Sequence, residues 1–141
     1  MNDELKIKMY AFTLDCKEPQ ELAKFYAALM NWEVMVLNDN FTCVYAPGSK
    51  HGGYPMLLFQ RNPDYVPPVW PEEPNAQQQM AHLDFAVSDI KKAVEHAVAC
   101  GARVSQQQFS DSWTVMFDPA GHPFCLCEMK SLMESPDFAL L

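Results

Sequence analysis

The sequence predicts an α+β fold made of two consecutive copies of one strand–helix–strand–strand–strand unit. Two amphipathic helix patterns lie about half a chain apart. Each is preceded by an alternating apolar segment and followed by three short strand patterns. A chain of 141 residues with 49% hydrophobic residues can fill one core of this kind. We therefore predict a single domain over residues 1–141.

The first unit is predicted over residues 6–61. Residues 7–14 alternate as a strand does, and Pro19 is well placed as the first residue of the following helix. The apolar face of this helix consists of Leu22, Phe25, Tyr26 and Leu29. Three short strands are predicted next, at residues 32–37, 41–46 and 56–61, with a loop at 49–53 before the last.

Residues 62–79 join the two units and contain five prolines, which exclude a helix or a central strand. Tyr65, Val66, Val69 and Trp70 are too apolar for a solvated linker. We predict a loop that folds back over the protein, with Trp70 covering either the core or a pocket mouth. The alternative is an extended linker between two halves.

The second unit is predicted over residues 80–130 and repeats the same order. A strand at 81–87 leads to Ser88, a good helix N-cap, and Gly101 is a fitting end for the helix. Its strands are expected at residues 103–107, 113–117 and 123–129. The tail 131–141 carries no clear pattern. The two helix starts lie 71 residues apart, from Glu18 to Asp89, and at this offset Leu14 matches Phe85.

Composition excludes several classes of partner. The net charge is −8 and the ten basic residues are scattered, which argues against nucleic acid. No apolar run is long enough to cross a bilayer, and the N-terminal segment lacks the apolar core of a signal peptide. We therefore predict no membrane partner and a cytoplasmic location. The five cysteines have no CxxC spacing and are read as reduced thiols.

Strand alternation predicts a cleft on the sheet face away from the helices. Phe12 and Leu14, the apolar positions of 83–87, and Phe124 with Leu126 are expected to face a helix. The opposite faces then carry small or polar residues, among them Thr13, His82, Asp84, Cys125 and Cys127. A closed core would be apolar on both faces, so this pattern favours a cleft lining.

Four segments carry a family resemblance: residues 14–34, 57–61, 82–104 and the hairpin FDPAGHPFCLC at 117–127. Together they resemble the vicinal oxygen chelate superfamily of glyoxalases, bleomycin-resistance proteins and extradiol dioxygenases, and most of all its glyoxalase-like domain branch. The resemblance covers nearly the whole chain. It implies that two βαβββ modules form a curved mixed sheet around a concave cleft, and that the protein is a homodimer.

In the metal enzymes of that superfamily, four strands each supply one His, Gln or Glu ligand to a divalent ion. The resemblance places His82, Gln60 and Cys125 at three of these positions, and Ala11, which cannot coordinate, at the fourth. It thus implies an incomplete site with no cofactor; the alternative is a three-ligand site for zinc, nickel, manganese or iron. His122 in the hairpin is predicted to be a turn or pocket-edge residue, and the cysteine pair buried filler rather than a nucleophile.

Two functions follow as alternatives. The first is a metal-free protein that binds a small aromatic or hydrophobic molecule; the second is a metal-dependent lyase, isomerase or dioxygenase acting on a small oxygenated substrate. For catalysis, His82 and Asp84 are the candidate residues, with Asp84 holding a proton or acting as a base. The predicted ligand pocket consists of Thr13, Gln60, Trp70, His82, Asp84, Trp113 and Cys125.

Overall fold

The fold is described from a computed structural model, which places residues 4–48, 55–130 and 134. The predicted loop at 49–53 lies outside these residues, as does the tail 131–141 apart from Glu134. Within the described ranges, no helix is long and apolar enough to cross a membrane.

The first module has the predicted order of elements and forms one four-stranded sheet. Its elements are β1 (Ala11–Cys16), α1 (Pro19–Met30), β2 (Glu33–Val36), β3 (Phe41–Tyr45) and β4 (Met56–Arg61). The strand order is β1-β4-β3-β2, in which β1 is parallel to β4 and the other neighbours are antiparallel. We call this the first sheet.

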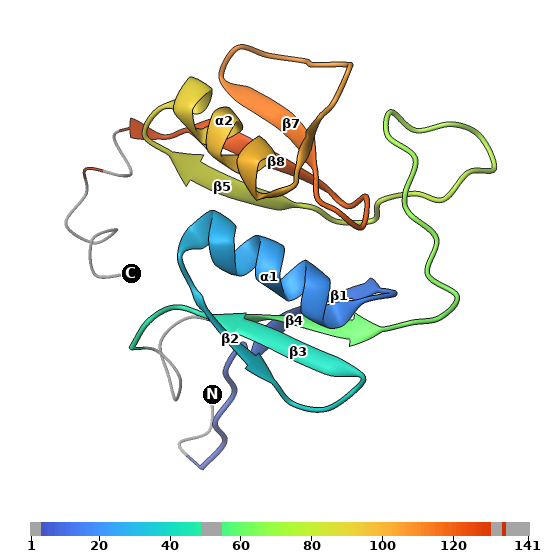
Figure 1. Ribbon diagram of the computed structural model, residues 1–141, viewed down its shortest axis with the longest axis vertical. Helices are drawn as coiled ribbons and strands as arrows, with labels where there is room; N and C mark the ends of the chain where they lie inside the picture. Colours follow the sequence, from blue (N-terminus) through green and yellow to red (C-terminus); the bar gives the residue numbers. More distant parts are fainter. Residues whose placement is uncertain (1–3, 49–54, 131–133, 135–141) are drawn as a thin grey trace.

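The second module repeats this topology. Its elements are β5 (Leu83–Val87), α2 (Ile90–Cys100), β6 (Arg103–Val104), β7 (Trp113–Phe117) and β8 (Pro123–Glu128). The second sheet has the order β5-β8-β7-β6, and β5 is parallel to β8. The predicted duplication of a βαβββ unit is confirmed (Figure 1).

The helix ends follow from local chemistry, with one correction. Helix α1 begins at Pro19, as predicted, and α2 ends at Gly101 with φ of 122°. The N-cap of α2 is Asp89, whereas Ser88 was predicted. The Asp89 carboxylate accepts a hydrogen bond from the Lys92 backbone N–H at 2.9 Å, and this bond fixes the cap one residue later.

One core joins the two modules, and α1 lies between the two sheets (Figure 1). Tyr26 on α1 is fully buried. Its ring centroid lies 5.5 Å from Phe59 of the first sheet, and 6.2 and 6.3 Å from Phe85 and Phe124 of the second. Aromatic contacts of this kind stabilise beyond their buried area. A single side chain of the first module thus packs on both sheets.

The residues that were predicted to face a helix pack in the core, with one exception. Phe124 and Leu126 are buried, and the apolar positions of β5 pack on the same core. Phe12 was also expected to face a helix, but its side chain is 45% exposed. It lies at the start of β1, the edge strand of the first sheet, whereas α1 contacts β2, β3 and β4.

Strand β6 is shorter than predicted because side chains replace its continuation. It spans Arg103–Val104 rather than residues 103–107. The Gln108 side-chain amide donates to the carbonyl oxygens of Ser105 and Val115 at 2.9 Å each, and its oxygen accepts from the Val115 N–H at 2.8 Å. The Ser105 N–H also donates to the Val115 carbonyl at 3.0 Å, so this backbone bond and the Gln108 amide together take the place of a longer strand beside β7.

The loop 62–79 folds back on the second module, as predicted. The Tyr65 hydroxyl donates to the Ala120 carbonyl at 2.8 Å, and Val69 N–H donates to the Gln77 carbonyl at 2.8 Å. Gly121 approaches this loop so closely that an added Cβ would lie 2.9 Å from Cβ of Pro67. The alternative of an extended linker is wrong.

The hairpin between β7 and β8 is organised by the buried carboxylate of Asp118. One oxygen accepts from the N–H groups of Ala120 and His122, and the other from the Tyr26 hydroxyl and His122 Nδ1, all within 2.7–3.0 Å. The other ring nitrogen of His122, Nε2, lies 2.8 Å from the Asp15 carbonyl in β1. His122 is thus a turn residue that also connects the two modules.

Candidate functional site

A pocket of about 300 Å³ lies on the face of the second sheet that points away from the helices. Three aromatic side chains, those of Trp70, Phe109 and Trp113, form part of its wall. Its remaining lining residues are Gln79, His82, Val115, Pro123 and Cys125. The size and the largely apolar wall are typical of a small-molecule site.

Two strands and two loops build this pocket. Val115 on β7 and Cys125 on β8 are register partners, so their side chains lie next to each other on one face. Trp70 comes from the loop 62–79, and Phe109 from the segment between β6 and β7. Their rings meet edge to face with centroids 5.9 Å apart, which encloses the pocket on one side.

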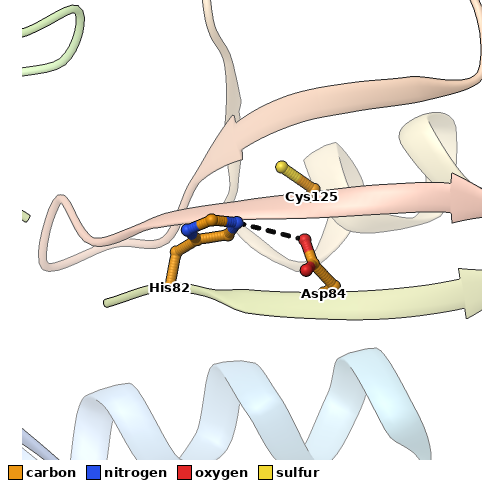
Figure 2. A group of neighbouring side chains, drawn as sticks. All are labelled: His82, Asp84 and Cys125. Carbon is orange, nitrogen blue, oxygen red and sulfur yellow. Dashed lines mark ion pairs between the residues drawn. The ribbon is translucent and has the colours of Figure 1, made fainter. Parts of the chain in front are cut away.

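His82, Asp84 and Cys125 form a polar cluster (Figure 2), and His82 and Cys125 also line the pocket. Asp84 on β5 and Cys125 on β8 are register partners across the parallel pair. His82 precedes β5, and its Nε2 lies 3.2 Å from Asp84 Oδ1. One donor atom from each residue lies within 4.8 Å of the other two.

The Cys125 thiol stays protonated at neutral pH. Burial, followed by the negative charge of Asp84, raises its pKa from 9.0 to about 12. The thiol and the Asp84 carboxylate also share a hydrogen bond that favours the neutral thiol. A nucleophilic cysteine needs the opposite environment, a nearby cation or base that favours the thiolate. The surroundings therefore suit a lining residue rather than a nucleophile.

The donors of this cluster are chemically suitable for a transition metal. An imidazole, a carboxylate and a thiol are the ligand types of zinc sites, whose metal–ligand bonds are roughly 2.0–2.3 Å. Donor atoms as far as 4.8 Å apart would need to move closer together to share one ion. Cys125 would also have to lose the proton that Asp84 and burial now stabilise. The cluster fits a metal only after these changes.

Four of the predicted pocket residues line this one pocket: Trp70, His82, Trp113 and Cys125. Asp84 lies beside them through its contact with His82. Thr13 and Gln60 lie elsewhere, on β1 and β4 of the first sheet. Across the described part of the chain, no hydrogen bond or ion pair joins the Gln60 side chain to the polar cluster; Asp84 stands there as the third possible donor.

Sequence reasoning predicted Trp70 but missed the other two pocket residues that come from loops. Phe109 and Gln79 reach the pocket from segments without period-two alternation, so no strand pattern could assign them to a face. Val115 could have been found, because it lies two residues after Trp113 on the same strand face. No sequence pattern predicted that Arg103 would lie over the ring of Phe117 on the same sheet.

Comparison with solved structures shows the same fold in several proteins. A glyoxalase/bleomycin resistance protein/dioxygenase family enzyme from Burkholderia phytofirmans superposes with a TM-score of 0.64 at 13% identity, covering 86% of this chain and 98% of that one. The trypanothione-dependent glyoxalase I of Leishmania major gives 0.60 at 17% identity, covering 96% of each chain. A glyoxalase family protein from Enterococcus faecalis gives 0.61 at 20%, covering 86% and 97%.

No curated protein sequence matches the chain. The family model of the glyoxalase-like domain, however, matches residues 11–127, from the start of β1 to the second cysteine of the hairpin strand. This match spans both modules and agrees with the structural neighbours. The chain therefore belongs to the glyoxalase-like domain family.

Proposed function

We propose that this protein binds a small, flat organic molecule in the pocket on the second sheet, and that it does so without a metal ion. The observation that carries the proposal is the aromatic wall formed by Trp70, Phe109 and Trp113 around one pocket. Large apolar rings converging from two loops and a strand bury a planar ligand at little conformational cost.

The polar cluster would orient such a ligand. His82 and Asp84 are 39% and 61% exposed at the side chain, so each can still bond a ligand group. The buried Cys125 sulfur, whose S–H already bonds Asp84, offers a weak acceptor at the pocket wall. Ala11 has no donor atom, and Gln60 lies on the first sheet, which supports a metal-free binding mode.

The proposal is tested with a neutral probe, 4-(1-naphthyl)butan-1-ol, titrated calorimetrically. We expect saturable binding at one site per chain. Trp113→Ala should raise Kd on the order of 3- to 10-fold, because an aromatic contact is worth about 0.5–1.5 kcal/mol. Trp113 is 39% exposed, so the substitution should leave the fold intact.

Phe12→Ala is the matched control, since Phe12 is an aromatic residue of similar exposure on the first sheet. It should leave Kd unchanged. The proposal is wrong if the probe shows no saturable binding, or if both variants weaken binding equally.

A second candidate function, metal-dependent chemistry on a small oxygenated substrate, is favoured by the His82–Asp84–Cys125 cluster. A bound ion there would supply Lewis-acid polarisation of substrate oxygens. His82 and Cys125 would hold it, with Asp84 as third ligand or as proton acceptor.

Elemental analysis of untagged protein after incubation with zinc, nickel, manganese or iron tests this candidate. Stoichiometric metal that is lost in His82→Ala but kept in His96→Ala would favour it, because His96 is an exposed histidine on α2. Protein that takes up none of these metals contradicts it.

A further inference from the structure

A groove of about 810 Å³ lies beside the proposed binding pocket, on the second sheet and the segment that follows β6. Its wall includes Trp70, Arg103 and Phe117, together with the glutamines 106–108. It is larger than the pocket, and its wall is more polar. The proposed function does not account for it.

Pocket and groove are neighbours. Trp70 lines both of them. Along β7, Val115 lines the pocket and Phe117 lines the groove, and two residues of one strand span about 6.6 Å on the same face. In the segment between β6 and β7, Phe109 of the pocket directly follows Gln108 of the groove. A ligand that extends past Trp70 therefore leaves the pocket and enters the groove.

Arg103 gives the groove a positive charge that the protein itself does not neutralise. Its guanidinium carbon lies 5.2 Å from the centroid of the Phe117 ring. Among the residues that the structure describes, no ion pair joins Arg103 to a carboxylate. Stacking on an aromatic face leaves the N–H edge of a guanidinium available for an anion.

The other residues of the groove wall carry no negative charge that would repel an anion. Arg103 is its one charged residue, and the three glutamines are neutral. The Gln108 amide is already used by Ser105 and Val115, which fixes this part of the wall. In a chain with net charge −8, an unpaired arginine in a hollow without acids is a specific feature rather than a general surface property.

We propose that the ligand carries an anionic group, a carboxylate or a comparable planar or tetrahedral anion, on an arm that extends from its aromatic ring. The ring occupies the pocket, the arm passes Trp70, and the anion pairs with Arg103 in the groove. This inference rests on the proposed function, because it names the chemistry of the molecule that the pocket binds. Arginine suits this task since its planar fork binds an oxyanion through two N–H groups.

The test compares two probes with the same ring and a similar arm, 4-(1-naphthyl)butanoic acid and 4-(1-naphthyl)butan-1-ol. For the natural sequence at low ionic strength, we expect the acid to bind about 10-fold more tightly, as is typical of a charge-assisted pair. Arg103→Gln should abolish this preference, so that the acid and the alcohol bind with similar Kd. Arg103→Lys should retain part of it.

Lys91→Gln is the matched control, since it removes one positive charge from α2, on the other side of the second sheet. It should leave the preference for the acid intact. Equal affinities for acid and alcohol overturn the inference but leave the proposed function standing. A preference for the acid that survives Arg103→Gln has the same two consequences. A preference that falls equally in Arg103→Gln and Lys91→Gln also has them. If neither probe binds, the proposed function and this inference are both wrong.

Discussion

Asp118 is the residue on which the hairpin and its contact with α1 depend. Its side chain is 1% exposed and accepts four hydrogen bonds, two from backbone N–H groups, one from Tyr26 and one from His122. Buried carboxylates are tolerated only when they are paired in this way. His122 uses both ring nitrogens, with Nδ1 2.8 Å from Asp118 Oδ2 and Nε2 2.8 Å from the Asp15 carbonyl oxygen.

We predict that Asp118→Asn lowers the free energy of unfolding by roughly 2–4 kcal/mol. An amide oxygen can still accept from the two backbone N–H groups. Its NH₂ group, however, would face the Tyr26 hydroxyl and His122 Nδ1, which now donate to the carboxylate. Urea denaturation measures the change. Asp111→Asn, at an exposed loop position, is the control, and similar losses in both variants would contradict the prediction.

At the scale of elements, the contact between the hairpin and the loop 62–79 can be tested at Gly121. Its φ is +92°, and an added Cβ would lie 2.9 Å from Cβ of Pro67. We predict that Gly121→Ala costs about 1–2 kcal/mol more than Gly48→Ala, measured by thermal unfolding. Gly48 has a comparable φ of +80° but nothing within 4 Å of an added Cβ, so it carries the backbone strain alone.

Equal losses at the two glycines would show that the loop moves away from the hairpin without cost. The Tyr65 hydroxyl bond to Ala120 argues against this, because it holds the same loop on the same turn.

Sequence patterns predict a strand well where backbone groups of neighbouring strands make its hydrogen bonds. They predict it poorly where a side chain makes these bonds instead. Period-two alternation correctly gave the helix-facing residues of β5 and β8, since those strands are paired and covered by helices. It failed at residues 105–107, where the amide of Gln108 takes over part of the strand pairing and no sequence pattern marks this. The same limit applies to the site. Strand alternation predicted His82, Asp84 and Cys125. Phe109, by contrast, is placed by the geometry of a loop, and Arg103 by stacking on the ring of Phe117.

At the scale of the whole molecule, several buried acidic groups make the fold sensitive to alkali. Burial raises the pKa of Cys16 from 9.0 to about 11 and that of Cys125 from 9.0 to about 12. Burial, the charge of Asp118 and the hydrogen bond to it hold the pKa of Tyr26 well above its usual 10.0. In each case folding favours the neutral form.

Each of these groups therefore makes its full contribution to the free energy of unfolding at pH values below its pKa in the unfolded chain. This contribution is lost as the pH rises through its pKa in the folded protein. We predict that the free energy of unfolding falls steadily between about pH 9 and pH 12, by on the order of 1–2 kcal/mol for each thiol. Circular dichroism during urea titration at several pH values measures this. The Cys16→Ala variant should show a weaker slope, and a free energy that is constant over this range would contradict the prediction.

The position of Tyr26 has a consequence for the origin of the fold. At the offset of 71 residues, its counterpart in the second module is Ala97, and both side chains are fully buried in the shared core. One half supplies a large ring where the other supplies a methyl group. Two copies of the first half would bring two rings into a space shaped for one, and two copies of the second would leave a void. The two halves are therefore complementary at this point of the core, and neither could pack against a second copy of itself without repacking the centre.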